Sequence, residues 1–213
     1  MKPMNDRVIR GLYAVTPDES DTALLAERVK AAVAGGARLL QYRNKGAPLS
    51  LRLEQARTLV HICRLSGVPL IVNDHPDVAL EVGAEGVHLG RDDGDVAAAR
   101  IRLPGKLLGV SCYNEIARAI SAERDGADYV AFGRFFPSVT KPGDIKASLG
   151  LVAEAKRCVH VPIVAIGGIT LEHTPSLIAA GIDAVAVISA LFASADVRES
   201  ARAFTALFEK GRK

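Results

Sequence analysis

Residues 41–45, Gln-Tyr-Arg-Asn-Lys, combine two cations with polar side chains directly after a short apolar run. If that run is a strand, the alternation of side chains turns Gln41, Arg43 and Lys45 in one direction and Tyr42 in the other. Two cations with a common direction suit a polyanionic ligand such as a diphosphate, whereas a solvated basic turn is the alternative explanation. The segment is therefore a candidate anion site that needs support from elsewhere in the chain.

Two aspartates could place a metal ion beside those cations. Asp74 follows the apolar residues 68–72, and Asp93 follows the next such run. Mg²⁺ is typically held by one or two carboxylates and leaves its other positions to water and substrate phosphates, so the pair predicts a Mg²⁺–diphosphate site. Taken alone, Asp74 is better explained as the cap of a helix that starts near Pro76. His88 lacks a second histidine or a cysteine at zinc spacing, so it is not predicted to be a metal ligand.

A second anion site is expected where the last two strands end. Gly167-Gly168 and Ser189 follow the predicted seventh and eighth strands, and phosphate sites in α/β barrels are often built from these two loops. Glycines there let backbone N–H groups approach phosphate oxygens that a side chain would screen. The loop after the sixth strand adds two hydroxyls and one cation: Ser138, Thr140 and Lys141. The pattern thus predicts two anions bound side by side, with a solvated loop as the alternative explanation for residues 137–141.

Eight short runs rich in β-branched residues must position these side chains. The predicted strands are Leu12–Val15, Arg38–Tyr42, Val68–Val72, Gly86–Leu89, Leu107–Val110, Asp128–Phe132, Ile163–Ile166 and Ala184–Ile188. Amphipathic helical patterns between and after them include Asp21–Ala34, Leu51–Ser66, Glu115–Arg124, Leu149–Cys158 and Asp196–Glu209. Several runs lack strict alternation, as expected for parallel strands buried on both faces. Eight strand–helix units predict a closed (β/α)8 TIM barrel with its active site at the C-terminal ends of the strands.

Composition narrows the class of protein further. The chain has 213 residues and a net charge of +3, which is too small to favour nucleic acid or an acidic membrane surface as a partner. Its three cysteines are far apart and odd in number, which favours reduced thiols and a cytoplasmic protein. Residues 1–10 lack the apolar core of a signal peptide. No linker or low-complexity stretch interrupts the pattern, so residues 1–213 are predicted to form a single TIM-barrel catalytic domain; a homo-oligomer is left open.

These motifs, taken together, resemble the thiamine phosphate synthase family over essentially the whole chain. Each matching stretch is short, but their order and spacing are highly specific. The stretches that carry the resemblance are Gln41–Lys45, Val72–Asp74, Gly86–Gly90 with Asp93, Gly109–Ser111, Ala127–Val130, Pro137–Lys141, Ala165–Ile169 and Val187–Ala190.

The resemblance implies an enzyme that joins a pyrimidine diphosphate to a thiazole phosphate. In the family, the pyrimidine diphosphate ionises to a carbocation before the thiazole nitrogen attacks, so Mg²⁺ and cations must stabilise charge on the departing pyrophosphate. The resemblance assigns binding of the pyrimidine diphosphate to Gln41, Tyr42, Arg43, Asn44, Lys45, Asn73, Ser111 and Lys141. It assigns Mg²⁺ to Asp74 and Asp93, and the thiazole phosphate to Ser138, Val139, Thr140, Gly167, Gly168, Ile188 and Ser189. Catalytic roles fall to Arg43, Lys45, Ser111 and Lys141.

Three positions depart from the family pattern. Asn44 stands where an acidic residue is frequent, Arg91 stands where glutamine is frequent, and Ser138 replaces threonine but keeps its hydroxyl.

Two other functions would suit parts of the pattern. A thiazole tautomerase-like paralogue shares the thiazole-phosphate end but generally lacks the second metal aspartate, here Asp93. A non-catalytic phospho-ligand sensor would leave the joint presence of both aspartates and the cations unexplained.

Overall fold

The computed structural model describes residues 9–137 and 147–210, and within them eight parallel strands close into a barrel in sequence order. The strands are β1 Gly11–Val15, β2 Leu39–Tyr42, β3 Leu70–Asn73, β4 Gly86–Leu89, β5 Leu107–Tyr113, β6 Tyr129–Phe132, β7 Ile163–Ile166 and β8 Ala184–Val187. β8 pairs with β1, with Gly11 opposite Ala184, and this pairing completes the ring. The predicted (β/α)8 barrel is confirmed.

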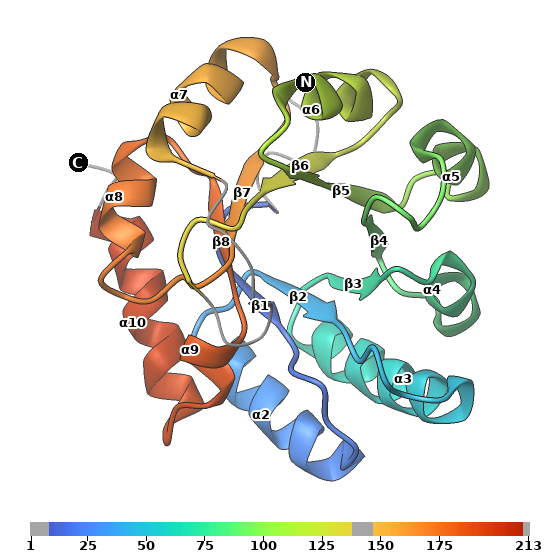
Figure 1. The fold of residues 1–213 in the computed structure, drawn as a ribbon. Coiled ribbons are helices and arrows are strands. Elements are labelled where there is room, and N and C mark those ends of the chain that lie inside the picture. The colour runs from blue at the N-terminus through green and yellow to red at the C-terminus, as the bar shows by residue number, and fades with distance from the viewer. Residues whose placement is uncertain (1–8, 138–146, 211–213) are drawn as a thin grey trace.

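Helices surround the strands on the outside (Figure 1). They are α2 Thr22–Ala34, α3 Leu49–Leu65, α4 Pro76–Val82, α5 Val96–Arg102, α6 Ile116–Arg124, α7 Leu149–Cys158, α8 Thr174–Ala179, α9 Ser189–Phe192 and α10 Val197–Lys210. Ser189, which follows the eighth strand, opens the short α9, and α10 is a separate helix that begins after Asp196. Among the helices of the described ranges, none is long and apolar enough to cross a membrane.

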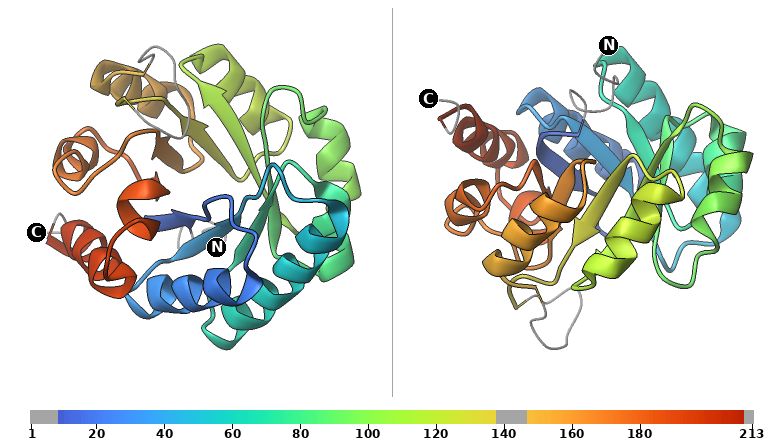
Figure 2. Two further views of the ribbon diagram at one scale, coloured as in Figure 1. Left: turned by 60° about the horizontal axis from the view of Figure 1, so that its bottom comes forward. Right: turned by 90° about the horizontal axis from the view of Figure 1, so that it is seen from above.

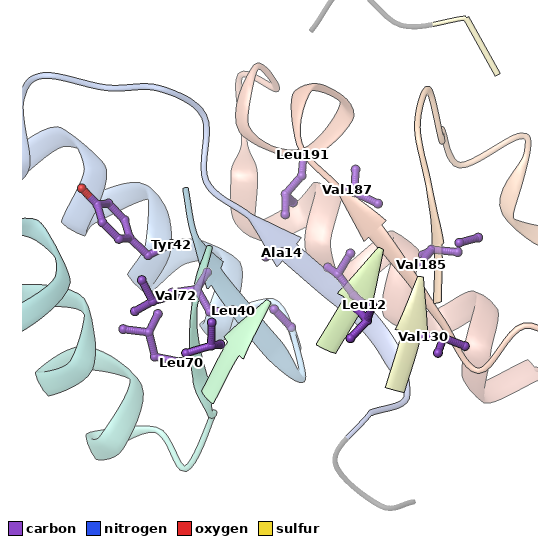
Figure 3. Close-up of a cluster of buried hydrophobic side chains, with 14 of the residues drawn as sticks. Leu12, Ala14, Leu40, Tyr42, Leu70, Val72, Val130, Val185, Val187 and Leu191 are labelled. Atoms are coloured by element: carbon purple, nitrogen blue, oxygen red, sulfur yellow. The ribbon is translucent and has the colours of Figure 1, made fainter. Parts of the chain in front are cut away.

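Side-chain alternation divides the apolar core into two layers. Leu12, Leu40 and Val72 belong to the larger layer, which packs between the strands and the helices (Figure 3). Tyr13, Ile71 and Tyr129 belong to a second layer inside the barrel. Seven strands supply both layers because successive side chains of a strand point to opposite faces, whereas β4 supplies Val87 and Leu89 to the outer layer only. The strands are therefore buried on both faces, as their apolar composition indicates.

Helices α2 and α10, the first and the last helix labelled in Figure 1, lie side by side (Figure 2). A side chain at Gly35, just after α2, would place its Cβ 2.3 Å from the carbonyl oxygen of Arg198 in α10. Glycine is therefore needed for the two helices to approach this closely. At the turns into the next strands, Gly36, Gly126 and Gly181 all have φ near +100°, the conformation that glycine adopts at lowest cost.

Candidate active site

A cavity of about 580 Å³ lies at the C-terminal ends of the strands. Most of the predicted site residues that the structure describes line it: Gln41, Arg43, Lys45, Asn73, Asp74, Asp93, Ser111, Gly167, Gly168, Ile188 and Ser189. Four others, Ser138, Val139, Thr140 and Lys141, lie outside the described residues. The residues that the fold brings to one rim thus lie at strand ends and in the segments after them, up to 148 positions apart in sequence, between Gln41 and Ser189.

The first strand's loop holds the cationic segment in place. Thr16 is fully buried, and its hydroxyl both donates to the carbonyl of Arg43 and accepts from the Arg43 N–H, each at 2.8 Å. Asp18 accepts a hydrogen bond from Arg43 Nη1 at 3.0 Å and one from the Lys45 N–H at 2.9 Å. These contacts fix the backbone at the end of β2, so the side chains of Arg43 and Lys45 start from a defined position.

Arg43 has unused hydrogen-bonding capacity. Its side chain is only 9% exposed, yet Nε is buried with no hydrogen-bond partner in the part of the chain that the structure describes. A buried guanidinium N–H without an acceptor costs free energy, so such groups usually meet a ligand or water. The fork geometry of arginine suits the oxygens of a phosphate. Arg43 is therefore a strong candidate for an anion contact.

Asp74 and Asp93 lie together on the same side of the cavity. Asp74 has φ of +63°, a left-handed conformation that aspartate tolerates better than most residues, and its Oδ2 lies 3.5 Å from Lys45 Nζ. Asp93 Oδ2 accepts a hydrogen bond of 2.7 Å from the Gly90 N–H. Burial, followed by the hydrogen bond and repulsion from Asp93, raises the pKa of Asp74 to about 6, while Lys45 opposes the shift. Two carboxylates held this close favour a bound cation between them.

The donor set fits Mg²⁺ better than a transition metal. Within the described ranges, no group of three histidine, cysteine or acidic side chains gathers to hold an ion. Two carboxylates beside an open cavity leave most of the coordination shell to water and ligand oxygens, which is typical of Mg²⁺. Capping does not explain Asp74, because His75 occupies the N-cap position of α4. The alternative explanation of Asp74 as the cap of this helix is therefore wrong.

Across the cavity, the turn after β7 brings backbone close to the rim. Gly167 and Gly168 have φ of +101° and +66°. A Cβ on Gly168 would lie 2.3 Å from the carbonyl oxygen of Pro137, and one on Gly167 would lie 2.6 Å from Cγ of Arg134. Only glycine fits both positions, and it leaves the main chain facing the cavity beside Ser189.

The tyrosine and asparagine of the 41–45 segment do not line this cavity. Tyr42 lies on the helix side of β2 in the outer apolar layer, where its hydroxyl donates to Gln55 Oε1 at 2.8 Å (Figure 3). Asn44 Nδ2 donates to the carbonyl of Glu19 at 2.7 Å and to Gln55 at 3.1 Å. Alternation along the strand explains the correction: these side chains support the segment from behind rather than facing a ligand.

Tyr113 on the rim and Asp18 behind it were not predicted from the sequence, and Arg91 was noted there only as a departure from the family pattern. Tyr113 reaches the rim because β5 runs three residues beyond its predicted end at Val110. Arg91 lines the cavity, pairs with Glu115 and lies 4.9 Å from the centre of the Tyr113 ring. Asp18, which positions Arg43, follows the first strand, so the rule that polar residues gather after barrel strands could have found it.

Comparisons with known proteins agree on one family. The model of the family described as thiamine monophosphate synthase matches residues 12–191. A thiamine-phosphate synthase from Nitrosospira multiformis is 53% identical over 205 residues, which cover 96% of this chain and 88% of that protein. One from Aromatoleum aromaticum is 50% identical and covers 97% of this chain and all of that protein.

Solved structures give the same result at the level of the fold. Thiamine phosphate pyrophosphorylase from Pyrococcus furiosus superposes with a TM-score of 0.87 at 33% identity, covering 97% of this chain and 99% of that chain. A 3-hexulose-6-phosphate synthase superposes with a TM-score of 0.68 at 22% identity, which shows a shared barrel only. The barrel is thus common to several activities, and the site residues must decide among them.

Proposed function

The chain belongs to the thiamine monophosphate synthase family, and from this membership we propose how the residues of its barrel rim divide the reaction among them. The reaction is a transfer in which 4-amino-2-methyl-5-hydroxymethylpyrimidine diphosphate and a thiazole phosphate give thiamine phosphate and pyrophosphate. The observation that carries the proposal is Arg43, whose buried Nε has no hydrogen-bond partner among residues 9–137 and 147–210 and lies on the same rim as the paired carboxylates of Asp74 and Asp93.

The diphosphate subsite is proposed to lie at the ends of β2, β3 and β4. Arg43 and Lys45 supply positive charge there, and Asp74 with Asp93 would hold Mg²⁺. When bound, Mg²⁺ neutralises negative charge on the diphosphate oxygens. Asp74 Oδ2 lies 3.5 Å from Lys45 Nζ, so the cation and the metal would face the same ligand oxygens. The protein groups are preorganised where charge accumulates as the C–O bond to pyrophosphate breaks.

The pyrimidine ring is proposed to lie between Gln41, Asn73 and Ser111. These side chains belong to β2, β3 and β5 and line the cavity below the diphosphate subsite. Their amide and hydroxyl groups can exchange hydrogen bonds with ring nitrogens and an amino group. Holding the ring here keeps its exocyclic carbon in line with the leaving group, which is the orientation that lowers the barrier.

The thiazole phosphate is proposed to lie on the opposite rim. Gly167, Gly168, Ile188 and Ser189 line this side, and the close backbone approach at Gly168 favours N–H contacts with phosphate oxygens. Ser138, Val139 and Thr140 would complete this subsite. Lys141 would bind the pyrimidine diphosphate and stabilise the departing pyrophosphate, so its catalytic contribution would exceed its contribution to thiazole-phosphate affinity.

The remaining expectations follow from this assignment. Residues 1–213 are proposed to act as one catalytic domain on small-molecule substrates, without nucleic acid or membrane partners. Cys63 and Cys112 are buried free thiols, which supports a reducing compartment such as the cytoplasm. The proposed site takes all of its residues from one chain, and assembly of such chains into a homo-oligomer would be compatible with it.

Incubation of the purified chain with both phosphorylated substrates and Mg²⁺ tests the function. Thiamine phosphate and pyrophosphate are expected in equal amounts, and chelation of Mg²⁺ should stop both. Asp93→Ala should fold normally and lose most turnover, while Arg202→Ala on the exposed face of α10 is the control. Isomerisation of the thiazole alone would contradict the proposal in favour of the paralogue, and binding without any product would favour a sensor.

A further inference from the structure

A continuous chain of hydrogen bonds crosses the floor of the cavity and links five strands. Gln41 Nε2 donates to the hydroxyl of Tyr13 at 2.8 Å, and the hydroxyls of Tyr13 and Tyr129 lie 2.7 Å apart. Tyr129 lies 3.1 Å from His88 Nδ1, and His88 Nε2 lies 2.9 Å from Ser111 Oγ. The two ends of the chain, Gln41 and Ser111, are the residues assigned above to the pyrimidine ring.

The middle of this chain is built into the barrel interior. Tyr13 and Tyr129 are 1% and 0% exposed, and their rings meet edge to face with centroids 5.9 Å apart. A Cβ on Gly109 of β5 would lie 2.0 Å from Cζ of Tyr129, so the ring fits only because that position is glycine. Burial raises the pKa of both tyrosines well above its ordinary value. Both hydroxyls therefore keep their protons and stay hydrogen-bond donors at neutral pH.

Within this hydrogen-bond chain only the bond at the Gln41 end has a defined donor, and that donor is compatible with one continuous direction along the chain. In that direction the Gln41 amide donates to Tyr13, the Tyr13 hydroxyl donates to Tyr129, and the Tyr129 hydroxyl donates to His88 Nδ1. With this direction His88 Nδ1 accepts, and a neutral His88 carries its proton on Nε2. That proton points to Ser111 Oγ, which leaves the serine hydroxyl proton free to face the cavity.

We propose that Tyr13, Tyr129 and His88 are positioning residues that fix the hydrogen-bonding sense of Gln41 and Ser111. In this arrangement Gln41 offers its carbonyl Oε1 to the cavity as an acceptor, and Ser111 offers a hydroxyl donor. The inference rests on the proposed function, since it assigns specificity to the pyrimidine end of that same site. It gives the buried tyrosines, which do not line the cavity themselves, a role in choosing the ring.

The resulting pattern suits an aminopyrimidine and disfavours its oxo analogue. An amino group next to a ring nitrogen presents a donor beside an acceptor, which complements Gln41 Oε1 and the Ser111 hydroxyl. Replacing the amino group by a carbonyl reverses both, because the carbonyl accepts and the adjacent ring N–H donates. A site whose polar groups cannot reverse rejects the wrong pattern strongly, since its buried groups are then left unpaired.

The tautomer of His88 tests the direction of the chain without any substrate. With ¹⁵N-histidine labelling, the His88 signal is assigned by its loss in His88→Gln, and its ring ¹⁵N–¹H correlations report which nitrogen carries the proton. We expect the Nε2–H tautomer in the ligand-free wild-type protein and a larger Nδ1–H population in Tyr129→Phe. A wild-type His88 with its proton on Nδ1 would overturn the proposal, because Ser111 would then have to donate inward.

Kinetics test the consequence for specificity. Tyr129→Phe and Tyr13→Phe each remove one hydroxyl and keep the ring, and both are compared with the wild type on the aminopyrimidine diphosphate and on its oxo analogue. We expect kcat/KM for the aminopyrimidine to fall about tenfold in each variant, the size of one lost hydrogen bond, while KM for the thiazole phosphate is unchanged. Discrimination against the oxo analogue should fall as well.

Thr205→Val is the matched control, since it removes a hydroxyl that binds the carbonyls of Ala201 and Gly36 at the opposite end of the barrel. It should leave both kcat/KM and the discrimination ratio unchanged. An unchanged discrimination ratio in both tyrosine variants, with wild-type melting temperatures, would overturn the proposal. Failure of the wild type to make thiamine phosphate would instead refute the proposed function, and the His88 tautomer would still report on the chain.

Discussion

Individual residues of the rim are positioned to bind ligands, and their arrangement lowers the stability of the ligand-free protein. Asp74 is the clearest case, because it combines a left-handed backbone, partial burial and a second carboxylate nearby. Its pKa is raised from 3.8 to about 6, so the folded protein binds more protons than the unfolded chain between about pH 4 and 6. The stabilisation from protonated Asp74 is present below that window and is lost as pH rises through it.

Asp74→Asn should therefore stabilise the metal-free protein while impairing catalysis. Asparagine also tolerates the left-handed conformation, so the backbone need not change. We expect a higher melting temperature than wild type at about pH 7.5 without metal, a weaker dependence on pH between about 4 and 6, and a large loss of turnover. Addition of Mg²⁺ should raise the wild-type melting temperature more than that of the variant. A lower melting temperature for the metal-free variant at neutral pH would contradict this account.

At the scale of elements, the turn between β7 and α8 shows how a short connection builds a binding surface. Gly167 and Gly168 have positive φ, and the second of them packs against the backbone of Phe136 and Pro137. His173, just before α8, stacks on Phe136 with centroids 3.6 Å apart and approaches the Gly168 carbonyl at 3.0 Å. The two loops thus support each other at the edge of the proposed thiazole-phosphate subsite.

Gly168→Ala should disturb that subsite selectively. The new Cβ would lie 2.3 Å from the Pro137 carbonyl oxygen in a conformation that alanine adopts with strain, so the two loops must separate. We expect KM for the thiazole phosphate to rise about tenfold or more, with a smaller change in KM for the pyrimidine diphosphate. Gly150→Ala, at a helical position with its nearest neighbour 3.7 Å away, is the control and should behave as wild type. Equal increases in both KM values would contradict the assignment of Gly168 to the thiazole-phosphate subsite.

For the whole molecule, closure of the ring depends on the contact between its first and last helices. Phe204 of α10 is fully buried and belongs to the core between strands and helices. Because β1 pairs with β8, loss of this packing loosens the barrel where the two ends of the chain meet.

Phe204→Ala should destabilise the protein by about 3 to 5 kcal/mol, the usual cost of emptying a buried phenylalanine site. For a chain of this size we expect the melting temperature to fall by roughly 10 °C, measured by circular dichroism. Arg202→Ala, on the exposed side of the same helix, is the control. A fall no larger than that of the control would show that α10 does not hold the ring closed.

Burial of weak acids makes the fold sensitive to alkali. Burial raises the pKa of Cys63 and Cys112 from 9.0 to about 12, and that of Tyr42 from 10.0 to about 12. Above about pH 9 the folded protein retains protons that the unfolded chain releases, so stability falls as pH rises toward 12. We expect the urea midpoint to decrease steadily over this range, less steeply in Cys63→Ala than in Cys158→Ser. A thiol reagent should find about one reactive cysteine in the native protein and all three after unfolding.

The amino-acid sequence alone determined the number of strands, the closed barrel and most of the rim. Buried parallel strands have distinctive β-branched runs, and barrel topology brings whatever follows each strand to one end. Alternation correctly turned Gln41, Arg43 and Lys45 toward the cavity, and Gly167-Gly168 marked a close backbone approach. These features depend on local spacing, which a sequence displays directly.

Contacts between distant strands were decided only by the tertiary structure. Local sequence alone favoured a helix-capping role for Asp74. In the structure Asp74 instead contacts Lys45 and Asp93, which lie on the loops of neighbouring strands. Tyr13 and Tyr129 are 116 positions apart, and nothing in either segment indicates that their hydroxyls meet beneath the site. Such pairs arise from the closure of the ring and from the space that Gly109 leaves for a ring on the next strand. Local patterns therefore placed the residues on the rim, whereas packing across the barrel determined which side chains contact and hydrogen-bond one another.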